Sequence, residues 1–274
     1  MKQTATKWMN HSACLMCGLL ILLISLTAVT ISSRKNPSSA SPELSEGLDY
    51  LASAESRDPL AADTFYREMQ KERMSALKNT QEKEALIEDI KNERIDIYSL
   101  FKDYVILGDS RAYGFSHFQF LDHSRVLAGG GDTIRNVRDH MNRIKNLDPS
   151  YIYLCYGIND AGIGIWKTPE DYAAEVLTVI NELREALPDA EILYSSIIWI
   201  SDTAEANYPK WGQIYDFSEA CRSMCLENGI KYVDNDEICL LLKEQNMWAG
   251  DGIHLSKSFY KFWAQNLYLA ALEE

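Results

Sequence analysis

Short apolar runs alternate with longer amphipathic stretches from about residue 104 to the end of the chain. Runs of this kind fit buried strands, and stretches with one apolar face fit helices. The strand candidates are residues 104–107, 126–128, 151–156, 191–200 and 231–233. The helix candidates lie near residues 134–146, 169–187, 213–228 and 256–271. Because a parallel crossover usually needs a helix, the alternation predicts a parallel sheet covered on both faces, a three-layer α/β/α sandwich.

A long uncharged stretch, residues 12–33, lies well before this region. Its core reads LMCGLLILLISLTAVTI. As a helix with a rise of about 1.5 Å per residue, such a stretch can cross a bilayer. It predicts a transmembrane signal anchor after a short cytoplasmic segment, residues 1–11. A cleaved signal peptide, cut near Ser38 and Ala40, is the alternative, although Arg34 and Lys35 would then separate the apolar region from the cut.

The orientation of the anchor is not set by charge, because basic residues before and after it nearly balance. Almost the whole chain follows the anchor. We therefore expect a single-pass protein of the cell membrane, with its main domain on the extracytoplasmic side.

Two further segments connect the anchor to the alternating region. Residues 34–60 are rich in Ser, Pro and acidic residues, which predicts a disordered linker. Residues 61–100 contain no Gly or Pro, and their apolar positions follow helical spacing, which predicts a helical stalk of one or two helices. Its apolar stripe would pack on the domain or on another chain, and a simple spacer is equally consistent. The domain itself would span residues 101–274, and the oligomeric state is left open.

Composition and charge narrow the class of partner. A hydrophobic content of 46% suffices for a large core, and a formal net charge of -13 argues against broad contacts with nucleic-acid phosphates. The six cysteines are scattered. Cys221 and Cys225 would share a helical face, but no histidine pair or second C-x-x-C completes a metal site. We therefore expect no metal and no cofactor.

Two segments of the alternating region carry residues suited to nucleophilic catalysis. Ser110 follows the first apolar run within Gly-Asp-Ser, and a helix that starts there would direct free N–H groups into a crevice. Asp251 and His254 are three apart, so the carboxylate can accept from one imidazole nitrogen and leave the other free for a serine proton. Each segment alone is more typical of a turn or a helix cap.

Two other segments offer donors for a developing oxyanion. Gly131 lies in Gly-Gly-Gly-Asp-Thr, where a missing side chain lets a backbone N–H approach a ligand closely. Asn159 lies in Gly-Ile-Asn-Asp and supplies a neutral side-chain donor. Together the four segments supply the nucleophile, base, orienting carboxylate and oxyanion donors that one catalytic site would need.

The four segments resemble the blocks of the SGNH, or GDSL-type, hydrolases over the chain from about residue 104 onward. The resemblance implies a flavodoxin-like fold with a parallel five-stranded sheet. It implies that Ser110 is the nucleophile and that His254 and Asp251 complete the triad. The oxyanion hole would consist of the Ser110 N–H, the Gly131 N–H and the Asn159 side chain.

The substrate is less constrained by the sequence. The family's leucine after the serine is Arg111 here, and this cation would either favour an acidic or polyhydroxylated substrate or point into solvent. Trp166 and Trp199 could stack on sugar rings, although we expect Trp199 to be a core residue. With an outward-facing domain, these features predict an O-deacetylase that acts on envelope or other carbohydrate through an acyl-enzyme. A lipid or thioester hydrolase, an O-acyltransferase and a non-catalytic polymer-binding scaffold are the alternatives.

Overall fold

The computed structural model of the protein describes residues 59–77 and 81–273. The predicted cytoplasmic segment 1–11, the anchor 12–33 and nearly all of the linker 34–60 lie outside the described residues. Within the described ranges, no helix combines the length and the apolar character that crossing a membrane requires. The membrane anchor therefore stays a prediction.

Five parallel strands form one sheet in the order β2-β1-β3-β4-β5. The strands are β1 (Tyr104–Gly108), β2 (Val126–Ala128), β3 (Tyr151–Cys155), β4 (Glu191–Ser195) and β5 (Lys231–Val233). The predicted parallel five-stranded sheet is confirmed. Because all strands run in one direction, their carboxyl ends meet at one edge, where open α/β sheets gather their active groups.

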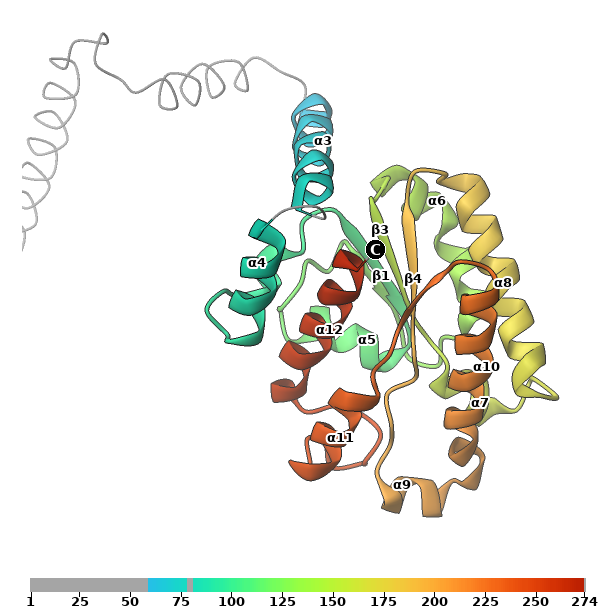
Figure 1. The fold of residues 1–274 in the computed structure, drawn as a ribbon. Helices are drawn as coiled ribbons and strands as arrows, with labels where there is room; N and C mark the ends of the chain where they lie inside the picture. Colours follow the sequence, from blue (N-terminus) through green and yellow to red (C-terminus); the bar gives the residue numbers. More distant parts are fainter. Residues whose placement is uncertain (1–58, 78–80, 274) are drawn as a thin grey trace, which may run out of the picture. The chain divides into compact units, whose positions relative to one another are not determined.

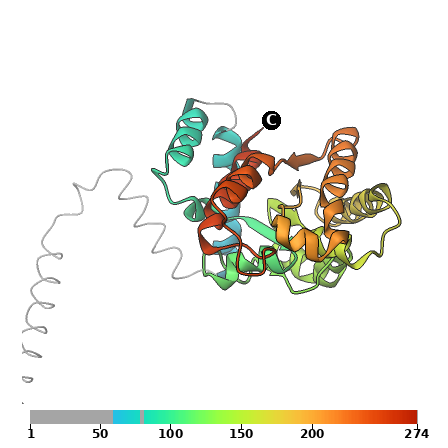
Figure 2. The same ribbon diagram turned by 90° about the horizontal axis from the view of Figure 1, so that it is seen from below.

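Helices cover both faces of the sheet (Figure 1), and Figure 2 shows the same arrangement from below. Val105 and Leu107 of β1 belong to one apolar core and Ile106 to the other, so alternate residues face opposite layers. One layer contains α6 (Val137–Leu147), α8 (Pro169–Ala186) and α10 (Ile214–Glu227). The other contains α5 (Ser110–His117), α11 (Asp236–Glu244) and α12 (Tyr260–Leu272). This confirms the three-layer sandwich.

The start of α8 illustrates how local sequence sets a helix boundary. Thr168 precedes the helix, and its Oγ1 accepts from the Asp171 N–H at 3.1 Å, while the Asp171 carboxylate accepts from the Thr168 N–H at 3.2 Å. Pro169 occupies the first helical position, where its missing N–H is not needed. The predicted helices near 134–146, 213–228 and 256–271 likewise correspond to α6, α10 and α12.

The predicted strand 191–200 is too long, because β4 ends at Ser195. Its neighbour β5 ends at Val233, which pairs with Ser195 and accepts from the Ser196 N–H at 3.0 Å, so residues 197–200 have no strand partner. Their backbone N–H groups are bonded elsewhere: Ile197 donates to Ser218 Oγ at 3.0 Å, and Trp199 donates to Cys239 Sγ at 3.4 Å. The apolar composition of this run reflects burial, which does not require an extended conformation.

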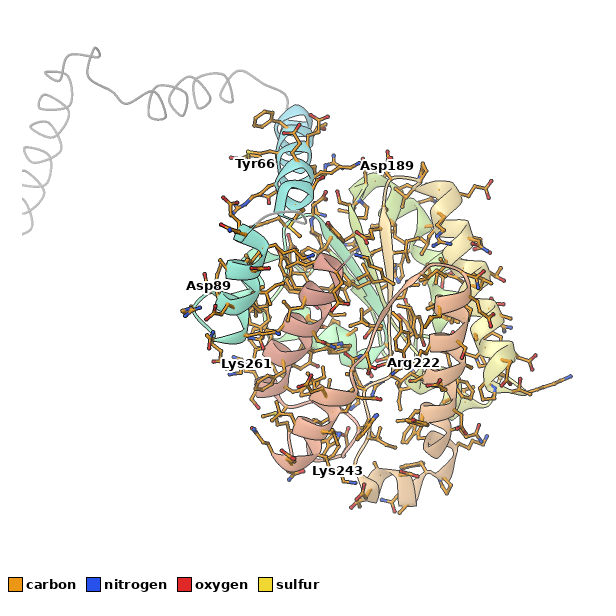
Figure 3. The ribbon with its side chains drawn as sticks, in the orientation of Figure 1. Tyr66, Asp89, Asp189, Arg222, Lys243 and Lys261 are labelled. Atoms are coloured by element: carbon orange, nitrogen blue, oxygen red, sulfur yellow. The ribbon has the colours of Figure 1, made fainter. Side chains whose placement is uncertain are left out.

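Two helices precede the sheet within the predicted stalk, α3 (Pro59–Leu77) and α4 (Gln81–Lys91). Ile90 of α4 is completely buried in the core that also contains α12. Gln265 of α12 donates from Nε2 to the Ile90 carbonyl at 3.0 Å, and Lys261 pairs with Glu93 at 2.7 Å. Figure 3 labels Lys261 on α12 and Asp89 on the neighbouring α4. The apolar side of α4 therefore packs on the domain, which was one of the stated alternatives.

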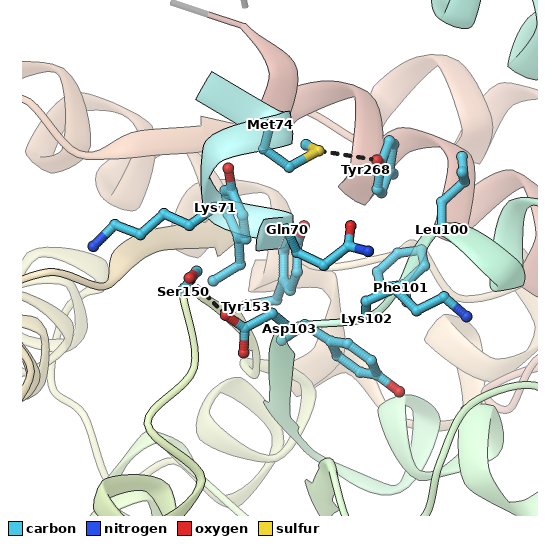
Figure 4. A pocket seen from close by; sticks show the side chains of 12 residues that line it. Gln70, Lys71, Met74, Leu100, Phe101, Lys102, Asp103, Ser150, Tyr153 and Tyr268 are labelled. Atoms are coloured by element: carbon cyan, nitrogen blue, oxygen red, sulfur yellow. Dashed lines mark hydrogen bonds between the residues drawn. The ribbon is translucent and has the colours of Figure 1, made fainter. Parts of the chain in front are cut away.

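A small hollow lies between α3 and the amino end of the sheet (Figure 4). Asp103, just before β1, accepts from Ser150 Oγ at 2.6 Å, and Tyr268 donates to Met74 Sδ at 3.3 Å. Burial raises the pKa of Asp103, a residue that is only 8% exposed. This edge is opposite the carboxyl ends of the strands.

The packing of α4 predicts a large effect of truncating Ile90. Ile90→Ala should lower the free energy of unfolding by about 2–5 kcal/mol, because it leaves a cavity at a completely buried position. Urea denaturation followed by tryptophan fluorescence measures this change. Leu226→Ala, at a residue 76% exposed, is the matched control and should change the free energy by less than about 0.5 kcal/mol. Equally small losses in both variants would contradict the packing of α4 on the domain.

Candidate active site

Ser110 is the first residue of α5 and follows β1 through a tight turn. Gly108 permits this turn, because a Cβ there would lie 2.7 Å from the Cys155 carbonyl oxygen of the neighbouring strand. Asp109 caps the helix, and its Oδ1 accepts from the Arg111 N–H at 2.9 Å. The Ser110 N–H therefore lies at a helix start, where backbone N–H groups have no partner within the helix.

His254 lies on a loop at the same edge of the sheet. Oδ1 of Asp251 accepts from the backbone N–H groups of Ile253 and His254, each at 2.9 Å. The Ser201 N–H donates to the Gly252 carbonyl at 2.8 Å, which ties this loop to the chain after β4. One carboxylate oxygen of Asp251 thus folds the loop, and the other stays available for the imidazole.

Three side chains from this edge form a continuous relay of hydrogen bonds. Ser110 Oγ lies 2.9 Å from His254 Nε2, and His254 Nδ1 lies 2.6 Å from Asp251 Oδ2. An ionised carboxylate only accepts, so Nδ1 carries the hydrogen and Nε2 is left to accept from the serine hydroxyl. The structure therefore brings together the three residues that the sequence singled out.

The pKa of Asp251 favours the charged form. Partial burial acts to raise this pKa, but hydrogen bonds from the His254 ring and from two backbone N–H groups outweigh burial, and the pKa lies below its ordinary value. Asp251 is thus a carboxylate at neutral pH, as the orientation of the imidazole requires.

The two predicted oxyanion donors belong to one hydrogen-bonded unit. Asn159, at the start of α7 (Ile158–Ile163), donates from Nδ2 to the Asp132 carbonyl at 2.8 Å. The second amide hydrogen is left for another acceptor. Gly131 has a φ of +83°, a conformation that favours glycine, and a Cβ there would meet no atom within 4 Å. The loop after β2 is therefore fixed against α7 next to Gly131.

Asp160 is a member of this unit to which the sequence analysis assigned no role. Its side chain is fully buried, and both carboxylate oxygens accept from the Ile134 N–H, at 3.3 and 3.2 Å. Oδ1 also accepts from Trp166 Nε1 at 3.1 Å. Burial raises the pKa of Asp160 to about 7 against the effect of these bonds. The signal in the sequence was its place as the last residue of the Gly-Ile-Asn-Asp segment, directly after Asn159.

The site geometry agrees with a comparison against protein families. The sequence model of the GDSL-like lipase/acylhydrolase family matches residues 106–262, a range that includes all the site residues above. The chain belongs to this family. Membership makes the chain a serine esterase. Among curated proteins, none matches the chain at the threshold that we required.

The chain is similar to several solved structures at low sequence identity. A protein named as a GDSL-like lipase from Parabacteroides merdae is 17% identical with a TM-score of 0.50, over 62% of this chain and 95% of that chain. A lipase/acylhydrolase from Enterococcus faecalis is 14% identical with a TM-score of 0.47, over 61% and 94% of the two chains. A catalytic variant of an acetylxylan esterase from Geobacillus stearothermophilus is 14% identical with a TM-score of 0.47, over 64% and 95%. The likeness to the first of these is one of fold.

Arg111 of the esterase lies where neither sequence alternative placed it. Its side chain is 3% exposed, its Nη1 donates to the Ile198 carbonyl at 2.6 Å, and its Nε lies 3.5 Å from Asp109 Oδ1. Tyr260 donates to the Arg111 carbonyl at 2.8 Å. The expectation that Arg111 contacts substrate or points into solvent is therefore corrected. The guanidinium instead neutralises the buried Asp109 directly before Ser110.

Trp166 of the esterase is held by the fold around it. Its indole N–H is bonded to Asp160, and the Arg135 guanidinium lies 4.5 Å from the ring centroid. A sugar ring would have to displace Arg135 to stack there, so this arrangement does not support the predicted contact with substrate. Trp199 is half-buried and packs against the core, as expected.

The buried pair of Arg111 and Asp109 predicts a large loss of stability when one partner is removed. Arg111→Met should lower the free energy of unfolding by about 3–5 kcal/mol, because it leaves the Asp109 charge buried and unpaired. Urea denaturation at neutral pH measures the loss. Lys243→Met, which breaks the exposed pair with Asp202, is the control and should leave the stability nearly unchanged. Similar stabilities for the two variants would argue against the role assigned to Arg111.

Proposed function

We propose that the chain hydrolyses carboxylic esters through an acyl-enzyme formed on Ser110. His254 Nε2 takes the hydroxyl proton as Oγ attacks the ester carbonyl, and it then returns the proton to the leaving alcohol. Water attacks the acyl-enzyme with the same base, which releases the acid and regenerates the serine. The 2.9 Å contact between Ser110 Oγ and His254 Nε2 is the observation that carries the proposal.

Asp251 would orient the imidazole and stabilise its charged form during each proton transfer. The 2.6 Å contact with Nδ1 supports this role. The oxyanion would be bound by the N–H groups of Ser110 and Gly131 and by the second amide hydrogen of Asn159. Each such donor contributes on the order of 3 kcal/mol in the transition state.

For substrate, we propose a small acyl ester, above all O-acetyl, on a carbohydrate. The His254 side chain is 46% exposed, which suits an ester presented by a bulky polymer. Tyr113 is 47% exposed and lies one turn after Ser110 on α5, where its ring could stack on a sugar beside the reacting group.

The location of the enzyme is part of the same proposal. Residues 12–33 would anchor it in the cell membrane, with the domain on the extracytoplasmic side. A tethered esterase there would meet carbohydrate polymers of the cell envelope.

Release of acetate from chemically O-acetylated polysaccharide tests the proposal directly. The full chain should release acetate, and Ser110→Ala should reduce the rate by at least about a thousandfold, because no other group can form the acyl-enzyme. Enzymatic determination of free acetate measures the rate, with p-nitrophenyl acetate as a second substrate.

Ser116→Ala, which removes a hydroxyl from the same helix, is the matched control and should keep the parental rate. Release of acetate by Ser110→Ala at the parental rate would overturn the assigned nucleophile. Turnover of p-nitrophenyl acetate without release of acetate from the polysaccharide would leave the chemistry intact and overturn the carbohydrate substrate.

A further inference from the structure

Asp160 is a fully buried carboxylate that the proposed reaction does not use. No ion pair joins it to a basic side chain in the described part of the chain, and burial of an unpaired carboxylate is unfavourable. The Asp160 carboxylate accepts hydrogen bonds from the loop after β2 and from Trp166.

The loop after β2 has little packing of its own near the predicted oxyanion donor. A Cβ at Gly130 or Gly131 would meet no atom within 4 Å, whereas Gly129 lies against the Asp132 carboxylate. Beyond this contact within the turn, the loop is held by hydrogen bonds with consecutive residues of α7. Asn159 donates to the Asp132 carbonyl at 2.8 Å, and Asp160 accepts from the Ile134 N–H at 3.2 Å. These two bonds flank Thr133 and hold both sides of it against α7.

Asp160 is shielded on its other side by Trp166. The indole N–H donates to Oδ1 at 3.1 Å, and the Arg135 guanidinium covers the indole ring at 4.5 Å from the centroid. Arg135 directly follows Ile134, so the loop is tied to Asp160 twice, through its backbone and through Trp166. The carboxylate is the common acceptor of both connections.

From these contacts we infer that Asp160 is a positioning residue that holds the Gly131 loop against α7, so that the Gly131 N–H and the Asn159 amide act on one oxyanion. The inference rests on the proposed ester hydrolysis. Asp160 touches neither the substrate nor the triad and acts only through its neighbours. Both oxyanion donors depend on the same short unit, because they come from the two segments that Asp160 joins.

The surroundings of Asp160 bring the pKa of its carboxyl group close to neutral pH. Burial raises its pKa from an ordinary value of 3.8 to about 7, bonds from Trp166 and Ile134 oppose this shift, and the charge of Asp109 adds to it. The other titratable groups around it are neutral at pH 7, because burial raises the pKa of each: Tyr156, Tyr172 and Cys221. The folded-state pKa lies above the ordinary value, so Asp160 makes the fold less stable as pH rises from about 4 to about 7.

Asp160→Asn separates positioning from a purely structural role. The neutral amide removes the buried charge, so the melting temperature at pH 8 should be no lower than that of the parental chain. The NH₂ group of the amide replaces one carboxylate oxygen and cannot accept from the Ile134 N–H. Loss of this hydrogen bond should loosen the loop. With p-nitrophenyl acetate we expect kcat to fall about tenfold or more, with KM changed less than threefold. Hydrogen–deuterium exchange of residues 129–136 should become at least about tenfold faster.

Asp103→Asn is the matched control, because it neutralises another buried carboxylate whose pKa is raised, at the opposite edge of the sheet (Figure 4). It should change neither kcat nor exchange in 129–136. Trp166→Phe keeps the ring but removes one donor to Asp160, and it should lower kcat by less than Asp160→Asn. This second variant keeps the test available if Asp160→Asn does not fold.

The outcomes separate this inference from the proposed function. Parental kcat and parental exchange in Asp160→Asn, with Ser110→Ala inactive, would overturn the positioning role and leave the esterase mechanism intact. A lower melting temperature at pH 8 with unchanged kcat would assign Asp160 to stability alone and also overturn it. Full activity of Ser110→Ala would contradict the proposed function, while the exchange of 129–136 would still decide whether Asp160 holds the loop.

Discussion

The hydrogen bond between Ser110 and His254 joins residues 144 positions apart in the chain. It depends on the parallel sheet, because strands that all run in one direction deliver the loop after every strand to the same edge. Gly108 lets α5 start close to β3, and the two backbone bonds to Asp251 fold the loop that carries the imidazole. Each side chain of the site lies within a few residues of a strand or helix end. No long loop is therefore needed to position it.

Two buried carboxylates, those of Asp109 and Asp160, stabilise the segments at this edge of the sheet. Asp109 caps α5 and is neutralised by Arg111, whose guanidinium also bonds to the irregular run after β4. Asp160 bonds to the loop after β2 and is shielded by Trp166. One carboxylate is balanced by a cation, and the other is held by neutral donors. The first arrangement fixes the start of α5, and the second fixes the loop after β2.

The parts of the fold that follow a simple period could be predicted from the sequence. Strands buried on both faces read as apolar runs, and α8 and α10 have a clear apolar face. The run after Ser195 was misassigned because burial alone gives the same pattern as a strand. The short helices α7 and α9 (Asp202–Asn207) have too few residues for a period to show. Arg111 and Asp160 could not be placed, because each also bonds to a distant segment, at Ile198 and at Ile134, and no local pattern reports a buried charge.

The pairing of Ser110 with His254 can be tested by the rate at which a fluorophosphonate reacts with the full chain, followed by peptide mapping of the adduct. The account predicts one adduct on Ser110, and a rate that falls by about a hundredfold or more in His254→Ala, because the hydroxyl then lacks its base. An adduct on another residue, or labelling of His254→Ala at the parental rate, would contradict it.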